Sequence, residues 1–105
     1  MTPERAQQIA YRMERAHEAL SAARLLLERG HVYDAINRMY YAGFYAVVAL
    51  LLVDGLYSSK HTGVRALFNM HWIRTEKLPV EVGKFFQLLF DSPMTWITAI
   101  SPPLR

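Results

Sequence analysis

Apolar side chains recur every three or four positions through the first part of the chain, which is the spacing of one helix face. The repeating positions are Ala6, Ile9, Ala10, Met13, Ala16, Leu20, Ala23 and Leu27. Thr2 is expected to cap this first helix, with Pro3 at the first helical position. The helix should stop near Gly30, because glycine suits the left-handed residue that commonly follows a helix end.

The pattern predicts three further helices. The second covers about residues 32–54, stops at Gly55, and is apolar nearly all round after Met39, which is typical of a central helix. A third helix fits residues 60–73, with Ser59 as its expected cap, and a fourth fits residues 79–90. Short loops between the helices favour antiparallel neighbours.

These elements predict an all-α fold, an antiparallel four-helix up-and-down bundle over residues 1–92. Residues 93–105 are expected to form an irregular tail, because Pro93 breaks the fourth helix. A length of 105 residues suits one domain, and 52% hydrophobic with 20% charged residues is ordinary for a globular protein.

The formal net charge of +3 and the isoelectric point near 9.5 permit a nucleic-acid partner. Arginines and glutamates alternate along the first helix, however, at Arg12, Arg15, Arg24, Arg29, Glu4, Glu14, Glu18 and Glu28. Such alternation is typical of a solvated helix face, and no basic cluster stands clear of the acids.

The chain contains no cysteine, which excludes disulfides and thiol nucleophiles and fits a reducing compartment. Residues 1–10 lack the apolar core of a signal peptide, and residues 39–53 are too few to cross a bilayer about 30 Å thick. We therefore expect a soluble, cytoplasmic protein without a membrane partner. The four histidines show no metal-ligand spacing, so neither a metal nor a cofactor is expected.

A polar stripe on the second helix is the main candidate site. Asn37, Arg38, Tyr41 and Tyr45 lie at helical spacing on one face, where the guanidinium could bind a phosphate and the rings could stack on a base. The alternative is a buried network, in which Arg38 pairs with Asp34 or with an acid on the first helix and the tyrosines fill the core.

Lys60 and His61 begin the third helix, where free backbone N–H groups favour an anion. They could hold a phosphate. Equally, His61 could cap a turn while Lys60 is simply solvated.

Three segments together resemble the HEPN domain family: Asp34-Ala35-Ile36-Asn37-Arg38-Met39-Tyr40-Tyr41-Ala42-Gly43-Phe44, then Ala49-Leu50-Leu51, then Lys60-His61-Thr62-Gly63-Val64. The resemblance covers roughly residues 10–90. It implies an all-helical bundle that usually forms a homodimer and acts beside nucleotides or RNA. Many prokaryotic members are coupled to a minimal nucleotidyltransferase in toxin–antitoxin pairs, and some are metal-independent endoribonucleases.

The resemblance therefore implies a nucleotide- or RNA-associated interaction module, with a nucleotidyltransferase as a partner. Alternatives are an endoribonuclease toxin and a structural dimerisation bundle without activity. Family ribonucleases carry an arginine followed four to six residues later by a histidine, and Arg65 and His71 match that spacing in letters. Six positions are about 600° of helical turn, which sets these two side chains well apart, so catalytic residues stay unassigned.

The C-terminal residues depart from the family, in which the fourth helix is typically followed by an arginine and then an Asp-Tyr pair. Here residues 91–97 read Asp-Ser-Pro-Met-Thr-Trp-Ile. One hypothesis is a frameshift, since Met94 to Thr98 can be encoded by codons whose neighbouring frame reads Asp-Leu-Asp-Tyr. It predicts that apolar helix surface is left uncovered.

Overall fold

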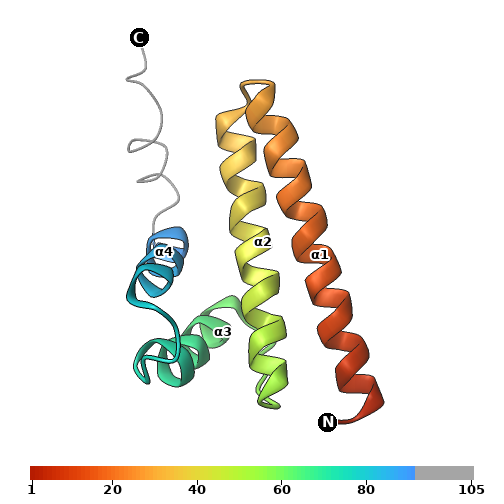
Figure 1. Ribbon diagram of the computed structural model, residues 1–105, viewed down its shortest axis with the longest axis vertical. Helices are drawn as coiled ribbons and strands as arrows, with labels where there is room; N and C mark the ends of the chain where they lie inside the picture. The colour runs from red at the N-terminus through yellow and green to blue at the C-terminus, as the bar shows by residue number, and fades with distance from the viewer. Residues whose placement is uncertain (92–105) are drawn as a thin grey trace.

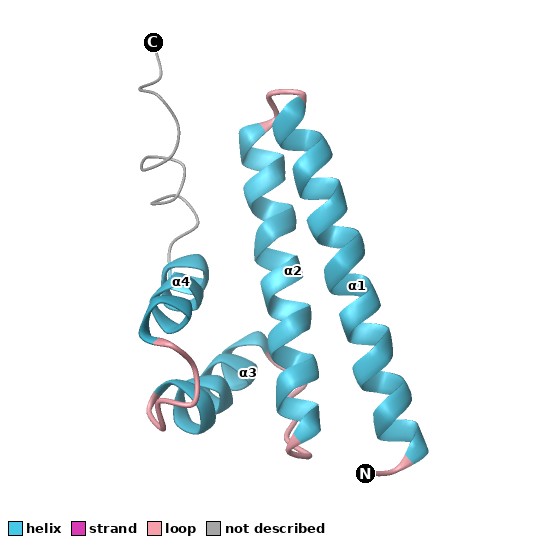
Figure 2. Cartoon of the chain, viewed as in Figure 1, coloured by secondary structure: helices cyan, strands magenta, loops and turns pink. Residues whose placement is uncertain are grey.

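The computed structural model describes residues 1–91, which form helices joined by short loops (Figures 1 and 2). No strand occurs among these residues, which confirms the predicted all-α class. The expected tail over residues 93–105 and the frameshift hypothesis both lie outside the described residues.

Helix α1 (Pro3–Glu28) begins and ends as predicted. The Arg5 backbone N–H donates to Thr2 Oγ1 at 3.1 Å, and Pro3 takes the first helical position, where its missing N–H costs nothing. Gly30 follows the helix end with φ of +81°, a left-handed conformation that glycine adopts without strain.

Helix α2 (Val32–Val53) returns antiparallel to α1, and the two lie side by side in Figure 1. Small side chains form the contact, because Ala16, Ala19 and Ala23 of α1 and Ala35 of α2 are buried. The larger apolar residues of α1 are less covered, and Leu20 is 38% exposed. The first helix therefore meets α2 through its alanines.

The third predicted helix is divided in two. Helix α3 (His61–Phe68) is followed by a π-helical turn, η1 (Asn69–Ile73), where the Arg74 N–H donates to the Asn69 carbonyl at 2.9 Å. Residues 60–73 were expected to form one regular helix. The widened turn brings Trp72 and Ile73 against the core, which spacing alone did not indicate.

Ser59 was the wrong choice of cap for this helix. Lys60 occupies the N-cap position and makes no side-chain cap hydrogen bond, whereas the Lys60 N–H donates to Ser58 Oγ at 3.2 Å. Ser58 lies close to the first turn of α3, and a Cβ on Gly63 would overlap its side chain. The tight approach of the loop therefore depends on glycine at this position.

Helix α4 (Val80–Asp91) packs against α2 at Gly43, where a Cβ would lie 2.7 Å from Leu89 Cδ2. The core cluster behind this contact consists of Val47, Val48, Leu51, Val64 and Phe68. The Phe68 ring meets those of Phe86 and Phe90 at centroid distances of 5.4 and 6.4 Å. Helix α2 contacts α1, α3 and α4, which confirms its central place.

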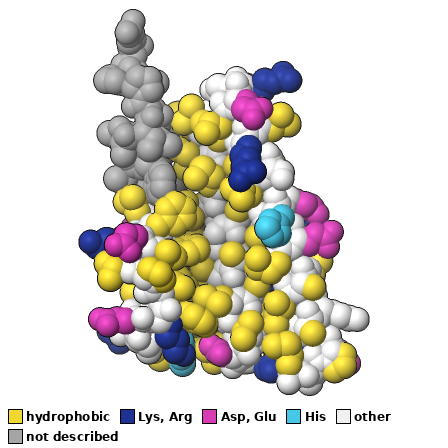
Figure 3. All heavy atoms as spheres, in the orientation of Figure 1, with side chains coloured by type: hydrophobic (Ala, Val, Ile, Leu, Met, Phe, Trp, Pro, Cys, Tyr) yellow, Lys and Arg dark blue, Asp and Glu magenta, His cyan; other side chains and the backbone are white. Residues whose placement is uncertain are grey.

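The four helices differ in length, so the bundle is a long α1–α2 hairpin with two short helices on one side of α2 (Figure 1). The residues that the structure describes form an apolar groove of about 390 Å³. Hydrophobic side chains also gather on the face shown in Figure 3. The lining of the groove comprises Ile9, Met13, Ala46, Val47, Ala49, Leu50, Val53, Phe68, Leu78 and Phe86.

Helix α2 is also long and apolar enough to cross a membrane by length and composition. The length argument in the sequence counted only residues 39–53, whereas the helix has 22 residues. A central bundle helix meets the same criterion, and α2 carries seven buried residues of this fold. The cytoplasmic location stays a prediction.

Candidate functional site

Two arginines and two tyrosines form a row of contacts that joins α1 and α2. The Arg38 guanidinium lies over the Tyr41 ring at 5.0 Å, and the Tyr41 and Tyr45 rings are 6.3 Å apart. Arg15 of α1 completes the row, with its guanidinium 5.5 Å from the Tyr45 centroid. We call Arg15, Arg38, Tyr41 and Tyr45 the arginine–tyrosine ladder.

The ladder lies at the surface and not in the core. Arg38, Tyr41 and Tyr45 are each half-buried, and Asn37 is exposed beside them. Within residues 1–91, Arg38 has no ion-pair partner, so its predicted alternative pairing with Asp34 is not formed. Its position over the Tyr41 ring compensates part of the desolvation of the guanidinium.

Arg15 is the ladder residue that sequence reasoning missed, because it was assigned to a solvated helix face. It does bind Glu18 at 3.1 Å, as that interpretation implies, but it also lies against Tyr45. The neighbouring Tyr45 side chain raises the pKa of Arg15 above its ordinary value. No sequence signal marks it, since the contact depends on how α1 and α2 are aligned.

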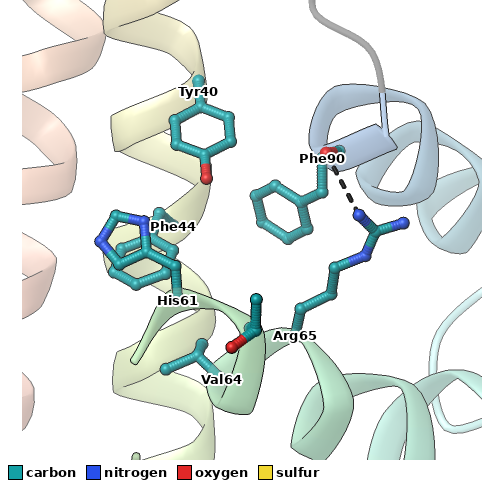
Figure 4. Close-up of a pocket in the computed structure, with 7 residues that line it drawn as sticks. Tyr40, Phe44, His61, Val64, Arg65 and Phe90 are labelled. Atoms are coloured by element: carbon teal, nitrogen blue, oxygen red, sulfur yellow. Dashed lines mark hydrogen bonds between the residues drawn. The ribbon is translucent and has the colours of Figure 1, made fainter. Parts of the chain in front are cut away.

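A second cluster surrounds a small pocket between α2, α3 and α4 (Figure 4). The pocket has a volume of about 120 Å³. It is lined by Tyr40, Phe44, His61, Thr62, Val64, Arg65 and Phe90. The lining combines aromatic and aliphatic side chains with the polar groups of Tyr40, His61, Thr62 and Arg65, and His61 and Thr62 are exposed to solvent.

The two basic side chains of this pocket, His61 and Arg65, contact different neighbours. The His61 ring lies against the Phe44 ring at a tilt of 33°, with centroids 4.2 Å apart. The Arg65 guanidinium donates to the Phe90 carbonyl at 3.3 Å and forms an ion pair with Asp91. Figure 4 shows the Tyr40 hydroxyl pointing into the space between His61 and Phe90.

The structure separates the remaining candidates. Lys60 is exposed and does not line the pocket, although its neighbour His61 does. His71 belongs to η1 and is likewise outside the lining, so Arg65 and His71 do not share this pocket. Arg65 instead shares it with His61, four residues earlier on α3, where successive turns place both side chains on one face.

Aromatic contacts join the pocket to the ladder. Tyr40 meets Tyr41 edge-on at 5.4 Å, and Phe44 meets Tyr45 at 6.5 Å. Helix α2 therefore carries an unbroken aromatic strip. Arg15 and Arg38 lie on one side of this strip, and the pocket lies on the other. Among the described residues, no three His, Asp or Glu side chains lie close enough together to hold a metal ion.

Comparison with known proteins agrees with this architecture. The sequence model of the HEPN domain family matches residues 9–95. A UPF0332 protein of Thermotoga maritima is 47% identical over 87 residues, which cover 83% of this chain and 66% of that protein. Two proteins of Methanocaldococcus jannaschii, each named "Putative toxin", are 32% identical over 83 residues and 43% identical over 61 residues.

The matched segment of the first of these two covers 79% of this chain and 56% of that protein, and that of the second covers 58% and 46%. Across the curated relatives that it matches, the chain covers between 41% and 66% of their own length. No solved structure matches the chain.

Proposed function

Because the chain belongs to the HEPN domain family, we propose that it is a nucleotide- or RNA-associated interaction module and one component of a toxin–antitoxin pair. Its partner in that pair would be a nucleotidyltransferase, and the chain itself would act as a cytoplasmic homodimer. The names of two relatives support the toxin assignment. The arginine–tyrosine ladder supports the nucleotide assignment.

The ladder carries the proposal because it joins the two chemistries that bind nucleic acid without sequence preference. Guanidinium groups bind phosphate oxygens in pairs, and tyrosine rings stack on any base. Arg15 and Arg38 flank the tyrosines, so a phosphate could be bound at either end of a stacked base. The half-buried rings are already held in place, which lowers the entropy that a ligand must remove.

The first prediction concerns Arg38. Arg38→Ala should weaken binding of a labelled RNA and of ATP by about tenfold or more, since charged hydrogen bonds and stacking contribute about 1–3 kcal/mol each. Arg24→Ala is the matched control, because it removes the same charge from an exposed α1 position. Binding is measured by fluorescence anisotropy at fixed salt, after circular dichroism has shown equal helicity.

Two outcomes would contradict the proposal. Equal loss in the Arg24 and Arg38 variants would indicate a nonspecific effect of net charge. Absence of binding by the wild-type chain would favour the structural dimerisation bundle and direct attention to a protein partner.

An endoribonuclease is the second candidate function, and the pocket is the observation in its favour. Arg65 could stabilise the charge that develops on a scissile phosphate, while His61 could move a proton. Cleavage of RNA in EDTA, lost in His61→Ala and retained in His71→Ala, would support it. Cleavage that survives both substitutions would exclude this pocket as the catalytic centre.

A further inference from the structure

We propose that the pocket between α2, α3 and α4 binds a single phosphate group, and that Asp91 competes with this phosphate for Arg65. The inference deepens the proposed function, because it states which part of a nucleotide or RNA the pocket would hold and what regulates its access. It does not require the ladder to bind a base.

The volume of the pocket limits the ligand. Sites that enclose a drug-sized molecule have volumes of about 300–1,000 Å³, whereas this pocket has about 120 Å³. A complete nucleotide therefore does not fit, but a phosphate-sized group does. The sugar and base would remain outside, where Phe44 connects the pocket to the ladder through Tyr45.

The polar groups of the pocket suit an anion. Arg65 and His61 lie one turn apart on α3 and can approach a common ligand from one helix face. Thr62 and Tyr40 add hydroxyl donors from α3 and α2. The free N–H groups of the first turn of α3 contribute positive potential in the same region.

Asp91 is the charged group that would compete with this ligand for Arg65. It pairs with Arg65, whose guanidinium also donates to the Phe90 carbonyl, so both bonds draw the cation to the end of α4. The Arg65 and Asp91 side chains are 42% and 57% exposed, and ion pairs as exposed as this contribute little to stability. A phosphate offers more charge and more acceptor oxygens than one carboxylate, so it can replace Asp91.

Competition by Asp91 and simple tethering of α4 predict different effects of Asp91→Asn on phosphate affinity. If Asp91 competes, Asp91→Asn frees Arg65 and tightens phosphate binding. If the ion pair only holds α4 in place, the same variant loosens α4 and either weakens phosphate binding or leaves it unchanged. An increase in affinity cannot arise from misfolding, which makes Asp91→Asn the decisive variant.

The test is a titration of the full chain with inorganic phosphate, measured by isothermal titration calorimetry at constant ionic strength. Asp91→Asn should lower the Kd for phosphate about two- to fivefold, the fold-change that a surface ion pair corresponds to. Glu81→Gln is the matched control, since it removes an equal charge from an exposed position at the start of α4. Arg65→Ala should abolish binding, with helicity checked by circular dichroism.

AMP and adenosine identify the source of the phosphate. We expect AMP to bind at least as tightly as phosphate. Adenosine has no phosphate group, so Asp91→Asn should leave its affinity unchanged. The proposal is overturned if the Asp91 and Glu81 variants behave alike, if Arg65→Ala binds phosphate normally, or if neither wild type nor Asp91→Asn binds phosphate. Loss of ATP binding in Arg38→Ala tests the ladder separately, so either site can fail alone.

Discussion

Gly63 has no side chain, and this allows the preceding loop to approach the start of α3 closely. In the sequence, Gly63 was noted only as part of a family resemblance. In the structure, Ser58 approaches the first turn of α3 so closely that a Cβ at Gly63 would overlap it. The same serine accepts the Lys60 N–H, so loop and helix depend on one contact.

Replacing this glycine should disturb α3 through Ser58 alone. Gly63→Ala should lower the free energy of unfolding by about 1–3 kcal/mol, the usual cost of overpacking. In a Ser58→Gly background both overlapping serine atoms are absent, so the same substitution should cost little. Urea denaturation of the four proteins measures the coupling, and equal costs in both backgrounds would show that Ser58 is not the cause.

The ladder shows which contacts helical spacing can predict and which it cannot. Arg38, Tyr41 and Tyr45 share one helix, so helical spacing was enough to predict that they project together, and the structure confirms that placement. Arg15 stands on another helix and was interpreted as a solvated charge. Its contact with Tyr45 depends on the register of α1 against α2, which no local pattern in either helix specifies.

At the level of elements, Gly43 determines how α4 meets α2. A Cβ there would lie 2.7 Å from Leu89 Cδ2 and 3.3 Å from Phe86 Cε1. Leu89 is 1% exposed, so its methyl group has little free space into which to move. The glycine lets two helix backbones approach more closely than any side chain would permit.

Gly43→Ala should therefore destabilise the fold despite the better helix propensity of alanine. Overpacking costs about 1–3 kcal/mol, against a propensity gain of about 1 kcal/mol. Gly83→Ala is the control within α4, because its Cβ would meet only the end of Ile73 at 3.3 Å, and it should be neutral or stabilising. Thermal unfolding by circular dichroism compares them; a stabilised Gly43 variant would contradict this account.

At the scale of the whole molecule, Phe68 holds three helices together. It is 1% exposed, belongs to α3, and contacts Phe86 and Phe90 of α4 beside the valines of α2. Contacts between α2 and the two short helices are fewer than those in the long hairpin. The attachment of α3 and α4 therefore depends strongly on this aromatic centre.

Phe68→Ala should lower the free energy of unfolding by about 3–5 kcal/mol, because it removes a buried ring and leaves a cavity. Met70→Ala, two residues away and 54% exposed, should change it by no more than about 0.5 kcal/mol. Urea unfolding monitored by circular dichroism provides both values. Similar losses for the two variants would show that Phe68 is not the centre of the fold.

The sequence by itself determined the helical class, the four helices and nearly all their ends, because caps, glycines and apolar periodicity act within one stretch of chain. It also determined the family, which the matched family model confirms. The tertiary structure alone decided that Arg65 lines a pocket with His61 and not with His71. It also decided that Arg15 joins the tyrosines and that residues 69–73 widen into a π-helical turn. These features depend on contacts between helices, where packing and register outweigh local preference.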